Sequence, residues 1–303
     1  MRYLVTGGSG MLGSHLKEEM PDLTYLSRKD CDLTSMHEVE KLIKFYKPYG
    51  IIHSAAKVGG ILENIKSPAD FYDQNILMNT NLLVSSMRNN VTRFLGILST
   101  CMYPEKSEIY PMAENNIHDG PPPASNFSYG YAKRAMGVQI EAYREQYGLK
   151  YNYLIPCNLY GEHDNFKDSL KSHFVTALIK KIIDAERAEQ TSIEIFGTGK
   201  PLRQFMYCGD LARVIKKIIE NDIDGSFNVA PPEQNYSIEE IALKAFRSLG
   251  KQGWAIRYDH TKPDGVYRKD VSCSKMLDVV GDFHFTPIES GIRKVYNKIV
   301  EEE

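Results

Sequence analysis

Ser99, Tyr129 and Lys133 are the residues whose types and spacing could carry out chemistry. Tyr129 and Lys133 are four positions apart, so on a helix both side chains lie on one face, where the ammonium would lower the pKa of the phenol. Ser99 follows a predicted strand and can donate a hydrogen bond to a carbonyl oxygen. With Tyr129 as proton donor and Lys133 holding a nicotinamide ribose, the three predict hydride transfer to a ketone.

A glycine-rich turn could bind the dinucleotide that this hydride transfer requires. It lies between a predicted strand at 2–6 and a predicted helix at 11–20, and this is the setting in which backbone N–H groups bind a pyrophosphate. A lone glycine cluster would more often be a tight turn, but the flanking strand and helix favour dinucleotide binding. The predicted cofactor residues here are Gly7, Gly8, Ser9, Gly10, Met11, Leu12 and Gly13.

The residues at the end of the next predicted strand, which spans 23–27, indicate which dinucleotide is bound. Ser27 and Arg28, followed by a lysine, offer hydroxyl and cationic groups that suit a 2′-phosphate, so we predict NADP(H) with Arg28 as the main contact. Asp30 and Asp32 would instead suit the ribose of NAD if the strand ended later, and Asp32 is kept among the cofactor candidates. A solvated turn without a ligand is the third interpretation.

The alternation of strand-like and helix-like segments predicts an α/β fold, with a doubly wound parallel sheet of the Rossmann type and a smaller α/β substrate-binding lobe. We expect a cofactor domain from 1–160 plus about 205–232, and a second lobe from 161–204 plus 233–303. Further strands are predicted at 51–54, 94–99, 151–156, 193–196 and 227–230. Further helices are predicted at 36–47, 70–89, 129–147, 170–188, 211–220 and 238–249.

Composition excludes several other classes of protein. The chain has 303 residues, of which 42% are hydrophobic and 25% charged, so disordered and fibrous classes are excluded. A net charge of −2 without a basic run makes nucleic acid a poor candidate partner. Five scattered cysteines indicate reduced thiols, and neither a signal peptide nor a membrane span is recognisable. We expect a cytoplasmic protein without a metal site.

Several further stretches carry a resemblance to a known family. They are 7–13, 55–60 (AAKVGG), 99–104 (STCMYP), 126–134 (NFSYGYAKR), 156–166 (PCNLYGEHDNF) and 197–205. On these residues the chain resembles the GDP-L-fucose synthase branch of the extended short-chain dehydrogenase/reductase superfamily. The resemblance implies NADPH-dependent reduction of the C4 keto group of a GDP-4-keto sugar, with epimerisation at C3 and C5. It also implies a homodimer formed through the helices predicted at 70–89 and 129–147.

The resemblance also assigns roles to individual residues. Cys101 and His173 match the base and acid of epimerisation, although without it we would interpret Cys101 as a buried small residue and His173 as a helix-surface histidine. The implied cofactor contacts are Ala55, Ala56, Leu98, Lys133, Pro156, Asn158, Leu159 and His173. The implied substrate contacts are Asn158, Asn165, Lys181, Phe196 and Arg203, together with Arg268 or Lys269. For Phe196, core packing is an equal alternative.

Departures from the family pattern gather on the substrate side. Lys181 stands where arginine is usual, Phe196 where tryptophan is usual and Cys157 where threonine is usual, and the stretch between Phe166 and His173 is one residue longer. A GDP-4-keto-heptose and reduction without epimerisation therefore remain open alternatives.

Three other functions of proteins with a similar fold would leave different signs. A 4,6-dehydratase would need an acidic pair where the chain has Cys101 and Met102. A hexose 4-epimerase would not consume its cofactor. A non-catalytic NADP-sensing protein would typically lack Tyr129 or Lys133.

Overall fold

The computed structural model describes residues 2–167 and 172–303. Its largest sheet has six strands in the order β2-β1-β3-β4-β5-β9, all paired in parallel. These strands are β2 (Thr24–Leu26), β1 (Tyr3–Thr6), β3 (Gly50–His53), β4 (Arg93–Ile97), β5 (Lys150–Pro156) and β9 (Phe227–Val229). The predicted Rossmann-type parallel sheet is confirmed.

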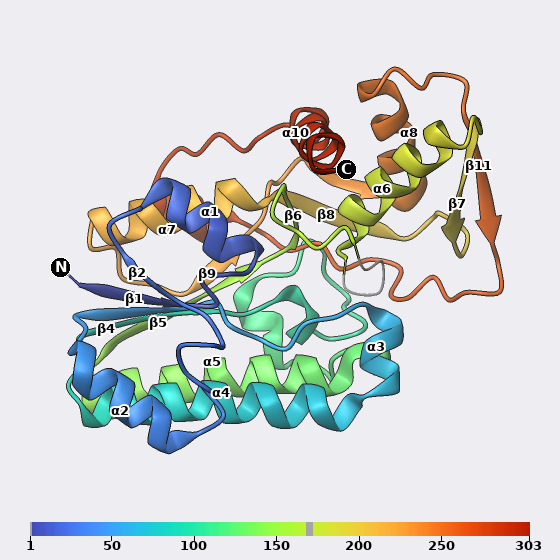
Figure 1. Cartoon of the computed structure of the whole chain (residues 1–303). Helices are drawn as coiled ribbons and strands as arrows, with labels where there is room; N and C mark the ends of the chain where they lie inside the picture. Colours follow the sequence, from blue (N-terminus) through green and yellow to red (C-terminus); the bar gives the residue numbers. More distant parts are fainter. Residues whose placement is uncertain (1, 168–171) are drawn as a thin grey trace.

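Helices cover both faces of this sheet (Figure 1). One face carries α2 (Met36–Tyr46), α4 (Pro68–Arg88) and α5 (Phe127–Tyr147). The other carries α1 (Met11–Glu19) and α7 (Cys208–Glu220), and α9 (Ser274–Val280) packs against α7 and β9. None of the helices in the described ranges combines the length and the apolar character that a membrane crossing requires.

The ends of β1 and β3 lie where the strand order switches: the chain first adds β2 on one side of β1 and then adds β3 on the other side. β1 pairs with β2 on one side and with β3 on the other, so the connections that follow these strands diverge. In open parallel sheets, ligands bind in the crevice at the carboxyl ends of the strands beside such a point. The glycine turn after β1 and the segment after β3 both lie at this edge.

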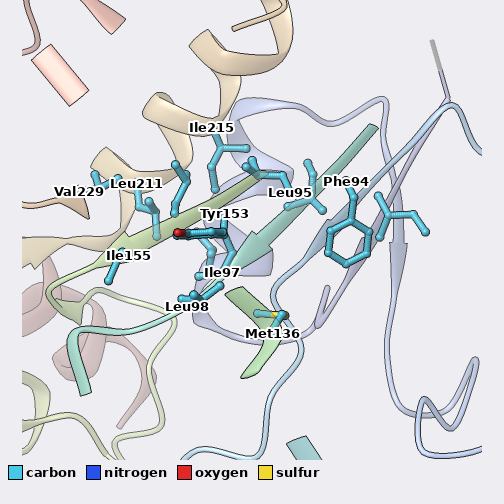
Figure 2. Close-up of a cluster of buried hydrophobic side chains, with 14 of the residues drawn as sticks. Phe94, Leu95, Ile97, Leu98, Met136, Tyr153, Ile155, Leu211, Ile215 and Val229 are labelled. Atoms are coloured by element: carbon cyan, nitrogen blue, oxygen red, sulfur yellow. The ribbon is translucent and has the colours of Figure 1, made fainter. Parts of the chain in front are cut away.

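Apolar side chains from strands and helices form the core around the middle of the sheet (Figure 2). Leu95, Tyr153 and Val229 come from neighbouring strands, with Met136 of α5 on one side and Leu211 of α7 on the other. Because β4 and β5 are covered on both faces, all of their residues except Lys150 are buried. This packing holds the carboxyl end of β4, and therefore Ser99, in a fixed position.

A second hydrophobic cluster lies in the C-terminal part of the chain. Its helices are α6 (Phe174–Arg187), α8 (Ile238–Ser248) and α10 (Ile288–Glu302). Its strands form a sheet of β10 (Asn235–Ser237), β8 (Leu202–Tyr207) and β6 (Asn158–Tyr160), and a pair of β11 (Ala255–Asp259) and β7 (Ser192–Phe196). Along β8 the side chains alternate between the two clusters, with Phe205 and Tyr207 in the second and Met206 in the first. The predicted domain boundaries stay a prediction.

Several element boundaries differ from the sequence prediction. The short helix α3 (Ile61–Lys66) and the long helix α10 were not predicted. α7 begins at Cys208 rather than at 211, and its first turn holds the buried Asp210, whose carboxylate accepts hydrogen bonds from the N–H and the hydroxyl of Thr286. The helix expected from Leu170 begins at Phe174, and Leu170 itself lies outside the described residues.

Candidate active site

One large cavity of about 1320 Å³ opens at the carboxyl edge of the main sheet. Single-ligand pockets usually enclose roughly 300–1,000 Å³, so this cavity has room for more than one ligand. It reaches from the glycine turn and the end of β2, past Ser99 and Tyr129, to Lys181 and Phe196 in the second cluster. All predicted site residues line it except Gly8, Asn165 and Arg268.

These three residues have other local contacts. Gly8 packs on β2, donating its N–H to Leu26 at 2.8 Å, and a side chain on Gly8 would clash with β2. The Arg268 guanidinium pairs with Asp270 at 2.6 Å. Asn165 accepts a hydrogen bond from the backbone N–H of Lys167 at 3.1 Å through Oδ1. Of the predicted pair Arg268 and Lys269, therefore, Lys269 is the one that faces the cavity.

The glycine turn is shaped so that backbone rather than side chains faces the cavity. Gly7 has a φ of +73°, and a Cβ on Gly13 would lie 2.3 Å from the Gly7 carbonyl oxygen. α1 begins at Met11, and no side chain in the described chain caps its first turn. The N–H groups of this turn are therefore available to an anion, and the donor set fits a dinucleotide pyrophosphate.

The residues at the end of β2 suit the 2′-phosphate of NADP better than the unphosphorylated adenosine ribose of NAD. The Asp30 carboxylate accepts two hydrogen bonds from Ser27, from N and from Oγ, both at 2.7 Å. Asp32 accepts hydrogen bonds from the N–H and the hydroxyl of Thr34. Both carboxylates thus close local turns, whereas the exposed side chain of Arg28 lines the cavity.

Ser99, Tyr129 and Lys133 come together from two elements. Ser99 follows β4 and caps a short 3-10 helix, accepting a hydrogen bond from the N–H of Cys101 at 3.2 Å. Tyr129 and Lys133 lie in the first two turns of α5. Lys133 Nζ lies 5.8 Å from the centre of the Tyr129 ring and donates to the Ile97 carbonyl at 2.7 Å. The predicted shared face of the helix is therefore present.

The expected effect of Lys133 on the phenol differs from what the structure shows. Burial raises the pKa of Tyr129 above its usual value, and Cys101 adds to this, while a hydrogen bond with Ser99 acts in the opposite direction. Burial also lowers the pKa of Lys133 to about 8. The expected lowering of the Tyr129 pKa is therefore not seen, because desolvation of the buried phenol outweighs the effects that favour its ionised form. Like an ordinary tyrosine, Tyr129 is protonated at neutral pH, and it can act as a donor.

Cys101 lies in a cationic environment. Lys269 Nζ is 3.6 Å from its sulfur. Burial raises the pKa of Cys101, but Lys269, Ser99 and Arg203 outweigh burial and hold it below the usual value. A thiol with a lowered pKa forms the thiolate, which is the basic and nucleophilic form.

His173 is held by a buried carboxylate. Asp164 accepts hydrogen bonds from both the backbone N–H and Nδ1 of His173, each at 2.9 Å. Burial lowers the pKa of His173, but Asp164 outweighs this effect and raises it above the usual value. The imidazole therefore retains its proton more readily than a free histidine, which suits a proton donor.

Comparisons with known proteins agree with this arrangement. Residues 3–230 match the model of the "NAD dependent epimerase/dehydratase family". The chain belongs to this family. It is 37% identical over 300 residues to a GDP-L-fucose synthase of Dictyostelium discoideum, covering 96% of this chain and 92% of the relative. The predicted resemblance is thereby confirmed.

Two solved structures of family members are also similar. A GDP-L-fucose synthetase from Naegleria fowleri bound to NADP is 31% identical, with a TM-score of 0.88, covering 99% of this chain and 92% of that one. A GDP-6-OMe-4-keto-L-xylo-heptose reductase from C. jejuni is 26% identical, with a TM-score of 0.90, covering 100% of this chain and 98% of that one.

Two features of this family member were missed in the sequence. Asp164 was quoted only as part of a motif, yet it is the residue that orients His173. Lys269 was grouped with substrate contacts, yet it lies against Cys101. The His-Asp-Asn-Phe motif at 163–166 could have indicated Asp164, because a buried aspartate needs a hydrogen-bond donor such as a histidine. No local signal links Lys269 to Cys101, which is 168 positions away.

Proposed function

We propose that this chain uses NADPH to reduce the C4 keto group of a GDP-4-keto sugar. The observation that carries the proposal is the convergence of Ser99, Tyr129 and Lys133 beside the glycine turn in one cavity. The names of its relatives, GDP-L-fucose synthase and GDP-4-keto-heptose reductase, supply the substrate class.

The dinucleotide would be held along the edge of the sheet. NADPH supplies the hydride when bound. The uncapped first turn of α1 would bind its pyrophosphate, and Arg28 would pair with the 2′-phosphate. Pro156, Asn158 and Leu159, at the ends of β5 and β6, line the same cavity. Asp30 and Asp32 are already engaged with neighbouring turn residues, which supports NADP(H) over NAD.

The residues around the ketone would donate a proton to its oxygen and stabilise the charge left behind. Ser99 would donate a hydrogen bond to the carbonyl oxygen and orient it. As the oxygen gains negative charge, the proton on Tyr129 moves to it, and the Lys133 ammonium stabilises the phenolate that remains. A buried phenol with a raised pKa would release its proton only when this charge develops.

The far end of the cavity would bind the GDP group. Lys181 Nζ lies 4.9 Å from the centre of the Phe196 ring and donates to the Glu194 carbonyl at 2.8 Å. Phe196 is 48% exposed, so one ring face is available to a base rather than being consumed by core packing. Arg203 lines the same cavity, interacts electrostatically with Cys101 and would pair with the diphosphate.

Epimerisation before reduction is a second candidate function, favoured by Cys101 and His173. A Cys101 thiolate would take the proton from the carbon beside the ketone, and Ser99 and Tyr129 would stabilise the enolate oxygen. His173 would return a proton to that carbon. The opposite displacements of the two pKa values support these roles.

Reduction without epimerisation on a GDP-4-keto-heptose is the main alternative. It is favoured by the likeness to the C. jejuni heptose reductase and by the departures at Lys181 and Phe196. The longer stretch between Phe166 and His173 falls partly outside the described residues.

One experiment tests the proposal and separates these candidates. The protein is incubated in D₂O with NADPH and either GDP-4-keto-6-deoxymannose or its heptose counterpart. Consumption of NADPH with a C4 alcohol as product supports reduction, and deuterium at C3 or C5 supports epimerisation. No oxidation of NADPH with either sugar would contradict the proposal and favour an NADP-sensing role.

We also propose that the chain forms a homodimer through α4 and α5. These two helices pack side by side and expose the apolar side chains of Tyr72, Leu77, Val138 and Tyr147. Light scattering on a size-exclusion column tests this, with Leu77→Glu and Val138→Glu expected to give monomers. A monomeric parent protein would contradict it.

A further inference from the structure

A cluster of two histidines and a glutamate lies outside the cavity, between α1 and the segment after β6. His15 and Glu18 are on α1, and His163 comes from the segment after β6. The Glu18 carboxylate contacts both rings, with Oε1 2.7 Å from His163 Nε2 and Oε2 3.3 Å from His15 Nδ1. One ligand atom from each residue can be chosen so that all three lie within 4.8 Å of one another.

His15 is buried with incomplete hydrogen bonding. Its side chain is 2% exposed, and its Nε2 lies 3.6 Å from Oε2 of Glu162, which is too long for a hydrogen bond. Neither of these atoms has a hydrogen-bond partner among the residues that the structure describes. A buried polar atom without a partner costs free energy, so this arrangement favours a ligand that would order the ring.

The donor atoms suit one class of ligand. Two imidazole nitrogens and a carboxylate form a donor set typical of Zn²⁺ and similar divalent ions, in sites that keep a further position open to solvent. Glu18 is exposed and His163 partly exposed, so an ion can enter from the surface.

We propose that His15 Nδ1, the Glu18 carboxylate and His163 Nε2 bind a single divalent transition-metal ion. With Nδ1 on the ion, the remaining proton of His15 is on Nε2 and faces Glu162. Histidines that bind metals usually donate the other ring N–H to a carboxylate in this way. Glu162 is itself held by the Tyr207 hydroxyl at 2.8 Å, so the support for the ligand is already in place.

The position of this ion gives it a structural consequence. It would join α1, the helix after the glycine turn, to the segment that follows β6. Asp164 is the next residue after His163, and it orients His173 through two hydrogen bonds. Metal binding would therefore tie the predicted cofactor-binding helix to the carboxylate that holds the predicted proton donor of epimerisation.

Metal titration of the full chain, without an affinity tag and after treatment with EDTA, tests the proposal. Zn²⁺ is titrated in competition with a chromophoric chelator, and Co²⁺ binding is followed by its visible absorption. We expect one ion per chain in the parent protein. Glu18→Gln and His163→Gln should each weaken binding by about 100-fold, the upper end of what loss of a supporting residue costs. His37→Gln removes an exposed histidine of α2 and should bind like the parent.

Three results would overturn the proposal. They are no Zn²⁺ or Co²⁺ binding by the parent protein, unchanged affinity in both Glu18→Gln and His163→Gln, and loss of binding in Cys101→Ser. The last would locate the ion in the cavity instead. Because neither Glu18 nor His163 is buried, both variants should keep the parent's melting temperature in EDTA, and circular dichroism checks this. The Co²⁺ spectrum of the parent reports imidazole ligation without any variant.

Discussion

The two ends of the cavity are built in different ways. At the cofactor end, the glycine turn, Ser99, Tyr129 and Lys133 are placed by the carboxyl ends of parallel strands and by the start of α5, all packed on the main core. At the sugar end, Cys101 follows Ser99 by two residues, but His173 at the start of α6 and Lys269 before α9 come from distant segments that reach this cavity only in the folded chain. Hydride transfer therefore depends on the rigid sheet, whereas the choice of sugar and the proposed epimerisation would depend on contacts between distant segments.

Substitution of Tyr129 by phenylalanine should have the largest effect. It removes the proton donor and retains the ring, so reduction should fall by about 10²- to 10⁴-fold. NADPH oxidation with GDP-4-keto-6-deoxymannose measures this. Deuterium exchange at C3 and C5 should fall less, because Ser99 still binds the enolate oxygen. A Tyr129→Phe protein that oxidised NADPH as fast as the parent would contradict the assignment of Tyr129 as the proton donor at the cofactor end.

Substitution of Cys101 by serine should affect the other end selectively. Loss of the thiolate base should lower deuterium incorporation at C3 and C5 by about 100-fold or more, while hydride transfer falls less. Mass spectrometry of the product in D₂O and NADPH oxidation are measured on the same sample. If deuterium incorporation and NADPH oxidation fell equally, epimerisation and hydride transfer would not depend on separate ends of the cavity. Cys157→Ser is the matched control, because burial raises the pKa of that thiol and it has no assigned role as a base.

Substitution of Arg28 by alanine sharpens the assignment of the cofactor end. Loss of a charge-assisted hydrogen bond costs about 1.5–3 kcal/mol, so the KM for NADPH should rise roughly 10- to 100-fold. The KM for NADH should change little. Lys29→Ala is the control, because Lys29 is exposed beside Arg28 but does not line the cavity. Equal changes for the two cofactors would contradict the assignment.

Substitution of Lys269 by methionine should have the smallest effect and tests the electrostatics of the sugar end. Removing the ammonium beside Cys101 should raise the pKa of the thiol, so its alkylation by iodoacetamide should slow at neutral pH and its pH midpoint should move upward. Peptide mass spectrometry identifies Cys101 among the five cysteines. Lys262→Met, on the exposed loop nearby, should leave the midpoint unchanged. A midpoint that did not move would exclude Lys269 as the cause.

Much of the cofactor end was predictable because its residues are neighbours in sequence. The glycine turn follows β1 directly, and Tyr129 and Lys133 share a helix face because they are four positions apart. α3 was missed because it is short and its apolar residues are largely exposed. The start of α6 could not be located because His173 caps it without a side-chain hydrogen bond, and so left no capping signal.

The parallel sheet, the glycine turn and the helix face shared by Tyr129 and Lys133 could be predicted from the amino-acid sequence, because each depends on periodicity or spacing within a short segment. Only the tertiary structure decided that Asp164 orients His173, that Lys269 lies against Cys101 and that burial raises the pKa of Tyr129. These features depend on desolvation and on contacts across many residues. Neither effect is set by the order of residues in a local segment.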